Sequence, residues 1–405
     1  MWQEVLSPIS EDWLQNFEPG SLAESFEVFV DDSNFPDLRN NQITLIGVPE
    51  DRSNPTHKGV SEASRAIRKE LYSLFPGSWN IKIADIGDII PGRDVIDTLS
   101  ALEEVCVEVI KLNSIPFILG GSSDLGLAIY RSFVRLERTI SATVLNSRIS
   151  LASDEETLNS NNYLSHILTS KPYRLYNLSH VGHQSYYVRP KILELFERMH
   201  FSTSRLGDIR GNIFMIEPLL RDADIIFFNN HVIKMADAPG QTEPSPNGLT
   251  GEEFCASMRY AGMSDKLSAT GIFDYNPRLD NTSQNAQLLA QGIWYFIDGV
   301  DWRKGDYPFR SKTDYTRFTV LTNGLEQEII FYKSPWSERW WIEIPAHPGQ
   351  DARNSLIACS LDDYESAQNG EIPDRYWKAV QKLSLIHISE PTRLLSISYA
   401  VFCLK

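Results

Sequence analysis

The chain has 405 residues, with 38 basic and 53 acidic side chains and a formal net charge of −15 at pH 7. It is long enough to bury a substantial core, and its acidity excludes the electrostatic attraction that nonspecific nucleic-acid binding needs. The sequence contains no run of about 20 apolar residues, which a membrane span would need. Met1 to Gly20 also lacks the pattern of a signal peptide. We therefore expect a cytoplasmic protein with neither a nucleic acid nor a membrane as partner.

From residue 41 onward, short apolar runs alternate with longer stretches of helical period, which predicts a mainly parallel sheet covered by helices. Apolar residues at three- and four-residue spacing from Val95 to Ile110 and from Leu289 to Ile297 predict two such helices. Asp280 and Thr282 are capping candidates for the second helix. The expected strands are residues 43–48, 81–86, 116–120, 142–146, 174–179, 224–228 and 269–274.

The cysteines of this region are Cys106 and Cys255, and Cys359 follows later in the chain. They lie far apart, and no CxxC pair or histidine-rich tract accompanies them. We expect buried, reduced thiols.

Beyond Gly305 the pattern changes to short strands separated by Asn-Gly and Ser-Pro-Trp turns, which predicts a C-terminal β-rich extension over residues 306–383. Residues 1–40 form an N-terminal extension, and 41–305 the α/β domain. Large aromatic side chains in the C-terminal extension are usually packing anchors, and the alternative is an exposed patch for a protein partner. The strands are 317–322, 328–332 and 339–345, and the aromatic residues are Trp336, Trp340, Trp341, Tyr364, Tyr376 and Trp377.

The last segment, residues 384–405, reads SLIHISEPTRLLSISYAVFCLK. It resembles a translated sequencing-library adapter, so we treat it as a probable non-native tail and exclude it from the fold prediction. The alternative is a genuine apolar tail that packs on the domain.

Five segments resemble segments of the ureohydrolases and occur in the same order as in that family, which comprises arginases, agmatinases and formimidoylglutamases. Among these enzymes, the segments resemble those of formimidoylglutamases most. The resemblance implies a three-layer arginase-like α/β fold and a possible homo-oligomer. The family adds water to a guanidine or amidine carbon by means of a hydroxide that bridges two manganese ions. The segments are 47–71 with DIGDI at 85–89, LGGSSDL at 119–125, DADIIFFNNHV at 222–232, APGQTEPSPNGLTGEE at 238–253 and FDYNPRLD at 273–280.

The resemblance also implies six metal-ligating positions, and none keeps the side chain of the family. The family motifs Gly-Gly-x-His, Asp-x-His-x-Asp and Asp-x-Asp correspond to residues 120–123, 146–150 and 229–231. A permanent cation at Arg148 would repel metal ions, and only His231 could still bind one. The loss of four carboxylates predicts no dinuclear centre and no cofactor. The six residues are Ser123, Asn146, Arg148, Ser150, Asn229 and His231.

Asp274 stands where the family keeps a glutamate that holds the guanidinium of the substrate. It could bind a small cationic ligand, but we favour an ion pair with Arg148 across the emptied pocket, because buried charges are usually paired. Asp124 lies in the same loop as Ser123 and could join a single metal ion at His231.

Four further residues, and one turn, have simpler interpretations. His180 and His183 are expected to be surface or packing histidines of a loop rather than a metal or acid–base site. Asp51 and His57 are expected to belong to a loop that caps the sheet, and contact with a ligand is the alternative. Thr250, with Glu253 three residues later, predicts a capped helix start.

The sequence therefore predicts a catalytically inactive ureohydrolase-fold protein that acts as a binding or assembly module. The first alternative is an active hydrolase of C–N bonds in linear amidines, which uses an atypical metal site at His231 with Asp124 or Asp274, or none. The second is a structural subunit whose pocket is filled by Arg148. The residues of the former active-site pocket are Ser123, Asp124, Asn146, Arg148, Ser150, Asn229, His231 and Asp274.

Overall fold

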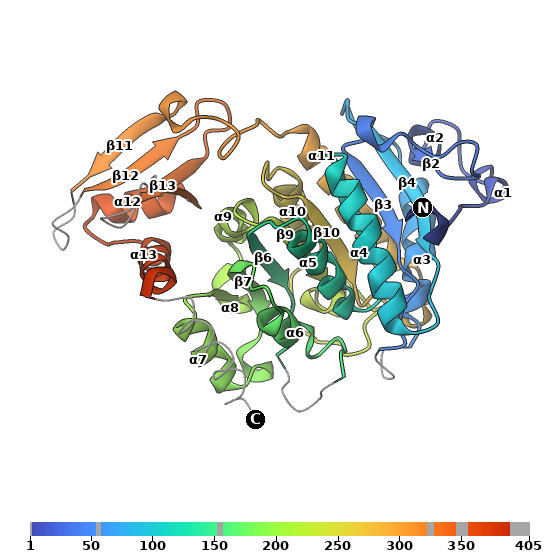
Figure 1. Ribbon diagram of the computed structural model, residues 1–405, viewed down its shortest axis with the longest axis horizontal. Coiled ribbons are helices and arrows are strands. Elements are labelled where there is room, and N and C mark those ends of the chain that lie inside the picture. The colour runs from blue at the N-terminus through green and yellow to red at the C-terminus, as the bar shows by residue number, and fades with distance from the viewer. Residues whose placement is uncertain (1, 54–57, 152–156, 322–327, 346–354, 389–405) are drawn as a thin grey trace.

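A computed structural model describes residues 2–53, 58–151, 157–321, 328–345 and 355–388. Figure 1 shows a large sheet covered by helices and a smaller sheet to one side of it, with its own helices. The order along the large sheet is β1-β4-β3-β5-β10-β9-β6-β7-β8, and β2 also pairs with β4. This arrangement confirms the predicted α/β fold with a mainly parallel sheet and a C-terminal β-rich part.

All seven predicted strands of the large sheet are present. Their compact apolar sequences are buried, as a parallel sheet covered on both faces requires. The strands are β3 (Ile43–Gly47), β4 (Ile83–Ile89), β5 (Ile115–Leu119), β6 (Ile140–Leu145), β7 (Leu175–His183), β9 (Ile225–Asn229) and β10 (Ala269–Phe273).

Three further strands lie at the two edges of the sheet. β8 (Ser202–Arg205) extends one edge beside β7. At the other edge, β1 (Leu6–Ser7) pairs antiparallel with the end of β4, and β2 (Glu27–Val28) pairs parallel with its beginning. Residues from the first forty thus become part of the large sheet.

Two apolar cores lie on opposite faces of the sheet. Alternate side chains of β3 point to different cores, since Ile46 belongs to the first and Leu45 to the second. The first core contains the apolar faces of α4 (Val95–Lys111) and α5 (Gly126–Arg135), and the second contains those of α3 (Ala63–Tyr72), α10 (Gly251–Gly262) and α11 (Gln284–Asp301). The helix–sheet–helix layering is the predicted one.

The starts of α10 and α11 differ in their capping. The Thr250 side chain accepts from the Glu253 N–H at 3.2 Å and the Glu253 carboxylate accepts from the Thr250 N–H at 2.8 Å, which confirms the predicted capping box. The N-cap of α11 is Ser283, not Asp280 or Thr282. Asp280 nevertheless accepts a 3.0 Å hydrogen bond from Ala286 N–H in the first turn.

The C-terminal sheet is antiparallel, in the order β11-β12-β13-β14, and its three predicted strands are present. The Ser-Pro-Trp turn joins β12 to β13, whereas the predicted Asn-Gly turn lies outside the described residues. The elements are β11 (Thr316–Val320), β12 (Ile329–Lys333), β13 (Trp340–Ile344), β14 (Ser355–Cys359), α12 (Leu361–Gln368) and α13 (Asp374–Ile388).

Most of the aromatic residues of this extension serve packing. Trp340 stacks on Tyr364 with ring centroids 4.6 Å apart, and Trp341 and Tyr376 are buried. Trp336 and Trp377 keep 42% and 39% of their surface exposed, so a partner at this extension remains a prediction.

Arg221, at the end of α9 (Glu217–Arg221), holds the C-terminal sheet against the α/β part. Its guanidinium donates to the carbonyls of Trp340 and Cys359 at 3.0 and 2.9 Å and lies 4.4 Å from the ring centroid of Trp341. Asp222 accepts from the Ala358 N–H of β14 at 2.9 Å. Charge-assisted bonds and a cation–π contact therefore join the two sheets.

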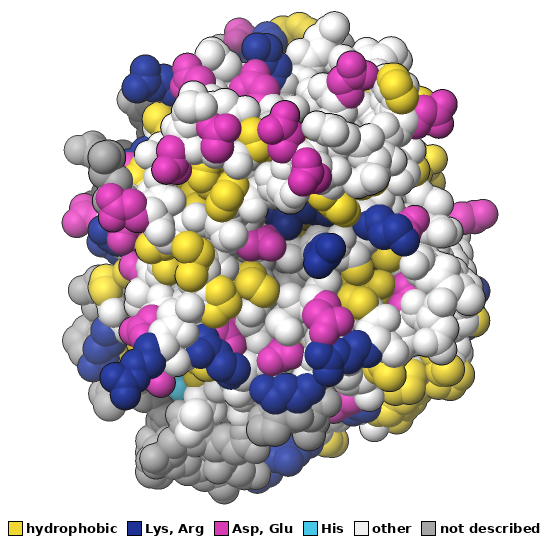
Figure 2. Space-filling view, turned by 90° about the vertical axis from the view of Figure 1, so that its right-hand side faces the viewer, with side chains coloured by type: hydrophobic (Ala, Val, Ile, Leu, Met, Phe, Trp, Pro, Cys, Tyr) yellow, Lys and Arg dark blue, Asp and Glu magenta, His cyan; other side chains and the backbone are white. Residues whose placement is uncertain are grey.

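The three cysteines before the tail, Cys106, Cys255 and Cys359, are buried free thiols, as predicted. Burial raises the pKa of all three, that of Cys255 to about 11. In the part of the chain that the structure describes, no helix combines the length and the apolar character needed to cross a bilayer. Figure 2 shows acidic and basic side chains interspersed on the face that lies at the right of Figure 1.

Candidate functional site

Asp274, Asn229 and Ser123 meet at the carboxyl ends of three neighbouring strands. Asp274 follows β10, Asn229 ends β9 and Ser123 lies in the loop after β5, and β10 is the middle strand of the three. The buried Asp274 carboxylate accepts from the Ser123 N–H at 3.1 Å and from the Asn229 amide at 2.5 Å. Parallel strands place their following loops at one edge of the sheet, where α/β proteins bind ligands.

His231 extends this hydrogen-bond chain from the other side of Asn229. The Asn229 side-chain oxygen accepts from His231 N–H at 2.9 Å and lies 2.8 Å from His231 Nδ1. His231 Nε2 lies 3.3 Å from both Thr242 Oγ1 and the Glu243 N–H. A ring whose Nδ1 donates to Asn229 can accept at Nε2 from Glu243, so the surrounding protein groups satisfy both nitrogens.

Asp124 is a second buried carboxylate beside Asp274. One of its oxygens accepts from the Ser122 hydroxyl and from the Ser53 hydroxyl, the latter at 2.9 Å. Its other oxygen, Oδ2, is buried and makes no hydrogen bond within the described residues. Burial, and to a smaller extent the charge of Asp274, raise the pKa of Asp124 to about 6 despite the two hydroxyl donors.

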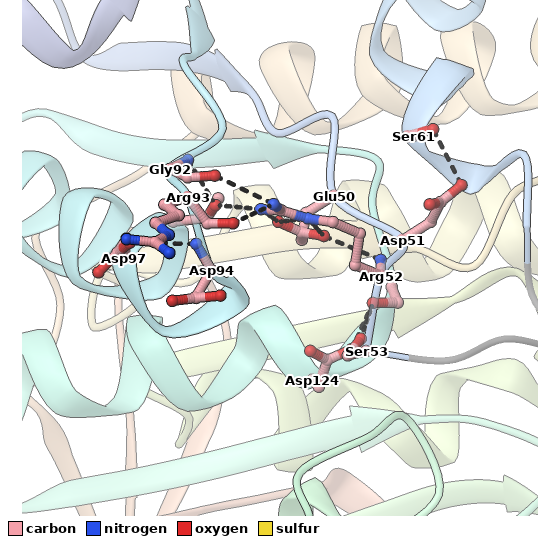
Figure 3. A network of polar contacts seen from close by, with 12 residues as sticks. Glu50, Asp51, Arg52, Ser53, Ser61, Gly92, Arg93, Asp94, Asp97 and Asp124 are labelled. Carbon is pink, nitrogen blue, oxygen red and sulfur yellow. Dashed lines mark hydrogen bonds and ion pairs between the residues drawn. The ribbon is translucent and has the colours of Figure 1, made fainter.

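The loop after β3 lies against Asp124 and carries its own ion pair (Figure 3). The buried Glu50 carboxylate binds the Arg52 guanidinium at 2.5 Å, and Arg52 also donates to the carbonyls of Gly92 and Arg93 at 3.0 and 2.9 Å. Arg52 thereby fastens this loop to the one that follows β4. The adjacent Ser53 is held where its hydroxyl reaches Asp124.

Asp51 serves the same loop. Its carboxylate accepts from the Gly59 N–H at 2.8 Å and from the Ser61 hydroxyl at 3.0 Å. Burial tends to raise the pKa of Asp51, but these hydrogen bonds and Lys58 outweigh it and the pKa lies below its ordinary value. These contacts agree with the expected sheet-capping loop, whereas His57 lies outside the described residues.

The loop after β6 carries Asn146, Arg148 and Ser150. Asn146 and Ser150 are buried, and the Asn146 side-chain oxygen accepts from the Arg148 N–H at 3.4 Å. The Asn146 N–H donates to the Val181 carbonyl of β7 at 3.1 Å. The neighbouring strand thus fixes the backbone of this loop.

The Arg148 side chain does not pair with Asp274, and that prediction is wrong. It forms a 2.8 Å ion pair with Glu243, and its guanidinium lies 4.0 Å from the ring centroid of Tyr187. The Arg148 side chain keeps 40% of its surface exposed, so the pair avoids most of the desolvation cost of a buried one. Asp274 takes its described hydrogen bonds from Ser123 and Asn229 instead.

His180 and His183 are packing residues, as expected, but they lie in β7 and not in a loop. Both are buried, and His180 Nε2 lies 3.0 Å from the Arg148 carbonyl. Burial, together with the nearby His183, lowers the pKa of His180 to about 3. His180 is therefore a neutral ring that supports the β6 loop.

Sequence reasoning missed Glu243, Ser53 and Ser122. Glu243 had a signal, because it is the only carboxylate between Ala238 and Gly251 in the segment that resembles the family. The Arg148 guanidinium needs a counter-charge, and Glu243 of this loop supplies it. The two serines had no such signal, since a serine near a glycine-rich turn is common in any loop.

The side chains at the six positions that the sequence resemblance assigns to metal ligands do not fit two manganese ions. Such ions take hard, mostly anionic oxygen ligands and imidazoles, whereas five of the six positions carry amides, hydroxyls or a guanidinium and only His231 is an imidazole. The Asn229 oxygen is already used by His231, as described above. Among the residues that the structure describes, no group of three His, Cys, Asp or Glu side chains could hold a metal ion.

A three-layer α/β fold with polar residues gathered at the carboxyl ends of β5, β9 and β10 is the arrangement expected of a ureohydrolase-like protein. Residues 41–297 match the model of the arginase family. This match spans more than half of the chain, so the chain belongs to the arginase family.

Relatives similar to the chain include two formimidoylglutamases. That of Halobacterium salinarum is 24% identical over 283 residues, which cover 63% of this chain and 87% of the relative. That of Halalkalibacterium halodurans is 22% identical over 275 residues, with 63% and 86% covered. These matches support the predicted resemblance to formimidoylglutamases.

Solved structures show the same fold. Trypanosoma cruzi formiminoglutamase with Mn²⁺ has a TM-score of 0.62 and 18% identity, with 70% of this chain and 99% of that one covered. Bacillus subtilis formimidoylglutamase has a TM-score of 0.60 and 18% identity, with 71% and 96% covered.

Proposed function

We propose that this chain is a catalytically inactive member of the arginase family that keeps the former active-site pocket as a binding or assembly module. The observation that supports it is the hydrogen-bond chain from Ser123 through Asp274 and Asn229 to His231. The family places metal ligands at three of these four positions. Here Asp274 accepts from the Ser123 backbone N–H and from the Asn229 side-chain amide, and the Asn229 side-chain oxygen bonds to His231.

Hydrolysis at neutral pH needs a strong nucleophile. A metal ion can lower the pKa of bound water from 15.7 to about 7. Two divalent ions in this pocket would repel the nearby Arg148 cation. The four carboxylates with which the family offsets the charge of the metal ions are absent here. The remaining groups can bind and orient a ligand, but they give no equivalent source of hydroxide.

The ligand we propose for this pocket is a small organic cation with an amine, amidine or guanidine group. Asp124 and Asp274 are both buried, and Asp124 Oδ2 makes no hydrogen bond within the described residues. A buried carboxylate oxygen without a donor is costly, and a cationic N–H donor would remove that cost. Above pH 6, Asp124 is mostly ionised, so binding should strengthen as the pH rises through about 6.

The first experiment measures manganese content on the full chain purified with manganese, together with release of urea or formamide from guanidine and amidine substrates. We expect neither stoichiometric metal nor turnover. About two manganese ions per chain with product release would refute the proposal.

Ligand binding is tested by calorimetric titration with methylguanidinium at pH 7. We expect Asp274→Asn and Asp124→Asn each to weaken binding about tenfold or more, because each removes a buried negative charge. Equal affinity in both variants and the parent chain would show that the pocket does not recognise cations.

A second function, hydrolysis of C–N bonds in linear amidines without a dinuclear site, is favoured by one observation. The pKa of about 6 at Asp124 suits a general base near neutral pH. The same activity assay decides it. Turnover without manganese that is lost in Asp124→Asn would establish this function in place of the inactive one.

A further inference from the structure

The two oxygens of the Asp124 carboxylate have different surroundings. Oδ1 accepts from the Ser122 hydroxyl of its own loop and from the Ser53 hydroxyl of the loop after β3, and the two hydroxyl oxygens lie 3.1 Å apart. Oδ2 has no hydrogen bond within the described residues. Both serines therefore bind the same oxygen, which fixes the orientation of the carboxylate, and Oδ2 is the oxygen that remains for a further donor.

The backbones of the loops after β3 and β5 lie directly on each other. The Ser122 N–H donates to the Glu50 carbonyl at 3.2 Å, and the Gly121 N–H donates to the Val60 carbonyl at 3.3 Å. Gly121 has a φ of +80°, and a Cβ atom at this position would lie 2.8 Å from the Val48 carbonyl oxygen. Glycine is therefore required here, and the two loops meet at a fixed separation.

Arg52 fixes the part of the β3 loop that carries Ser53 (Figure 3). Its guanidinium contacts both carboxylate oxygens of the buried Glu50, at 3.0 and 2.5 Å. It also donates to two backbone carbonyls of the loop after β4, at 3.0 and 2.9 Å, and to the Thr98 hydroxyl of α4 at 3.1 Å. A planar guanidinium can hold these partners at the same time, whereas the compact ammonium of a lysine cannot reproduce that geometry.

The charges of this network favour the same arrangement. Burial tends to raise the pKa of Glu50, but the hydrogen bonds and the charge of Arg52 outweigh it, so the pKa lies below its ordinary value. Burial raises the pKa of Asp124, and the hydrogen bonds from Ser122 and Ser53 act against that rise. Ser53 therefore favours the ionised form of Asp124, which is the form that attracts a cation.

We infer that Arg52 is a positioning residue of the proposed cation site and acts on Asp124 through Ser53. Arg52 makes no hydrogen bond to Asp124 among the residues that the structure describes. By fastening the β3 loop to the start of α4, it holds the Ser53 hydroxyl on Oδ1 and preorganises the carboxylate for a ligand at Oδ2. The inference rests on the proposed function for its ligand, but the loop contacts that it describes are present without one.

The first experiment measures the affinity of the full chain for methylguanidinium at pH 7 by calorimetry. Arg52→Gln should weaken binding about fivefold, which corresponds to the net contribution of one hydrogen bond. Arg52→Lys keeps the charge beside Glu50 and should lose less affinity, so it replaces Arg52→Gln if that variant does not fold. Arg65→Gln, the same change at an exposed arginine of α3, is the matched control and should bind as the parent chain does.

A double-mutant cycle with Ser53→Ala separates positioning from a general effect on the fold. Because Arg52 acts through Ser53, Arg52→Gln should weaken binding less than about twofold when Ser53 is already alanine. Full multiplication of the two losses in the double variant would overturn the inference. Parent-like affinity in both Arg52→Gln and Arg52→Lys would overturn it as well.

Amide hydrogen exchange tests the same contacts without a ligand. In Arg52→Gln, the Ser122 N–H should exchange about tenfold faster than in the parent chain, because its acceptor loop is no longer fastened. The amides of β5 should keep their rates. Unchanged exchange at Ser122 would overturn the inference whatever the binding result. Faster exchange in a protein whose parent chain does not bind methylguanidinium would instead refute the proposed function and keep Arg52 as the residue that positions Asp124.

Discussion

Two buried carboxylates, one in a strand of the large sheet and one in a loop that follows another strand, differ in how completely the protein hydrogen-bonds them. Asp85 of β4 is bound by the Arg68 guanidinium at 2.8 and 2.9 Å and by the Tyr72 hydroxyl at 2.7 Å. Asp124 receives only serine hydroxyls, and its second oxygen has no hydrogen bond within the described residues. The protein itself supplies hydrogen-bond donors to both oxygens of Asp85. One oxygen of Asp124 has no donor within the described residues. This difference distinguishes a structural ion pair from the carboxylate that we propose binds a ligand.

The largest effect is expected from Arg68→Met, which leaves Asp85 buried without its cation. Loss of one partner of a buried ion pair typically costs about 3–5 kcal/mol. The free energy of unfolding, measured with urea, should fall by that amount. Lys69→Met, at the exposed next position of α3, is the control and should change it by less than about 0.5 kcal/mol. Similar losses in both variants would show that Asp85 is not held as we describe.

Asp124→Asn should have the next largest effect, and its sign depends on pH. In the folded chain the pKa of Asp124 is raised from 3.8 to about 6. The contribution of protonated Asp124 to the free energy of unfolding is therefore fully present below about pH 4 and is lost as the pH rises through 6. The shift corresponds to about 3 kcal/mol. Above pH 7, the parent chain should therefore be less stable than Asp124→Asn by a margin that shrinks in acid.

The free energy of unfolding of Asp51→Asn, measured over the same range of pH, should show the opposite pH dependence to that of Asp124→Asn. The pKa of Asp51 is lowered, so its stabilisation is present above the ordinary pKa and is lost as the pH falls. The two variants should differ from the parent chain with slopes of opposite sign. Slopes of the same sign would contradict the assignment of Asp124 as an uncompensated carboxylate.

The smallest effect is expected for the ion pair between Arg148 and Glu243, whose side chains are 40% and 38% exposed. A double-mutant cycle of Arg148→Gln and Glu243→Gln should give a coupling of no more than about 1 kcal/mol in unfolding free energy, and it should weaken in high salt. A coupling above about 2 kcal/mol, independent of salt, would mean that Arg148 is buried in the pocket as the sequence suggested.

The fold was largely predictable, because its central strands are apolar runs buried on both faces. β8 was missed since Ser202–Arg205 is polar and lies at an edge of the sheet. β14 is apolar but only five residues long and leads directly into α12, and such a run cannot be distinguished from the start of a helix by periodicity.

The site was predictable in part. The order of loops along a parallel sheet indicated that Ser123, Asn229 and Asp274 could meet, and the structure brings them into one hydrogen-bond chain. The partner of Arg148 was not predictable, because a long side chain can reach several loops and its choice depends on exposure. Glu243 became the partner because the 238–253 segment folds so that its carboxylate lies within ion-pair distance of Arg148.

The short strands β1 and β2 have a consequence for the behaviour of the whole chain in solution. Together they pair with both halves of β4, and Ile90 N–H also donates to the Val5 carbonyl at 2.8 Å. An uncovered β4 would offer a row of backbone donors and acceptors to strands of other molecules. The N-terminal segment thus covers this edge of the sheet, so we expect its loss to favour self-association through β4.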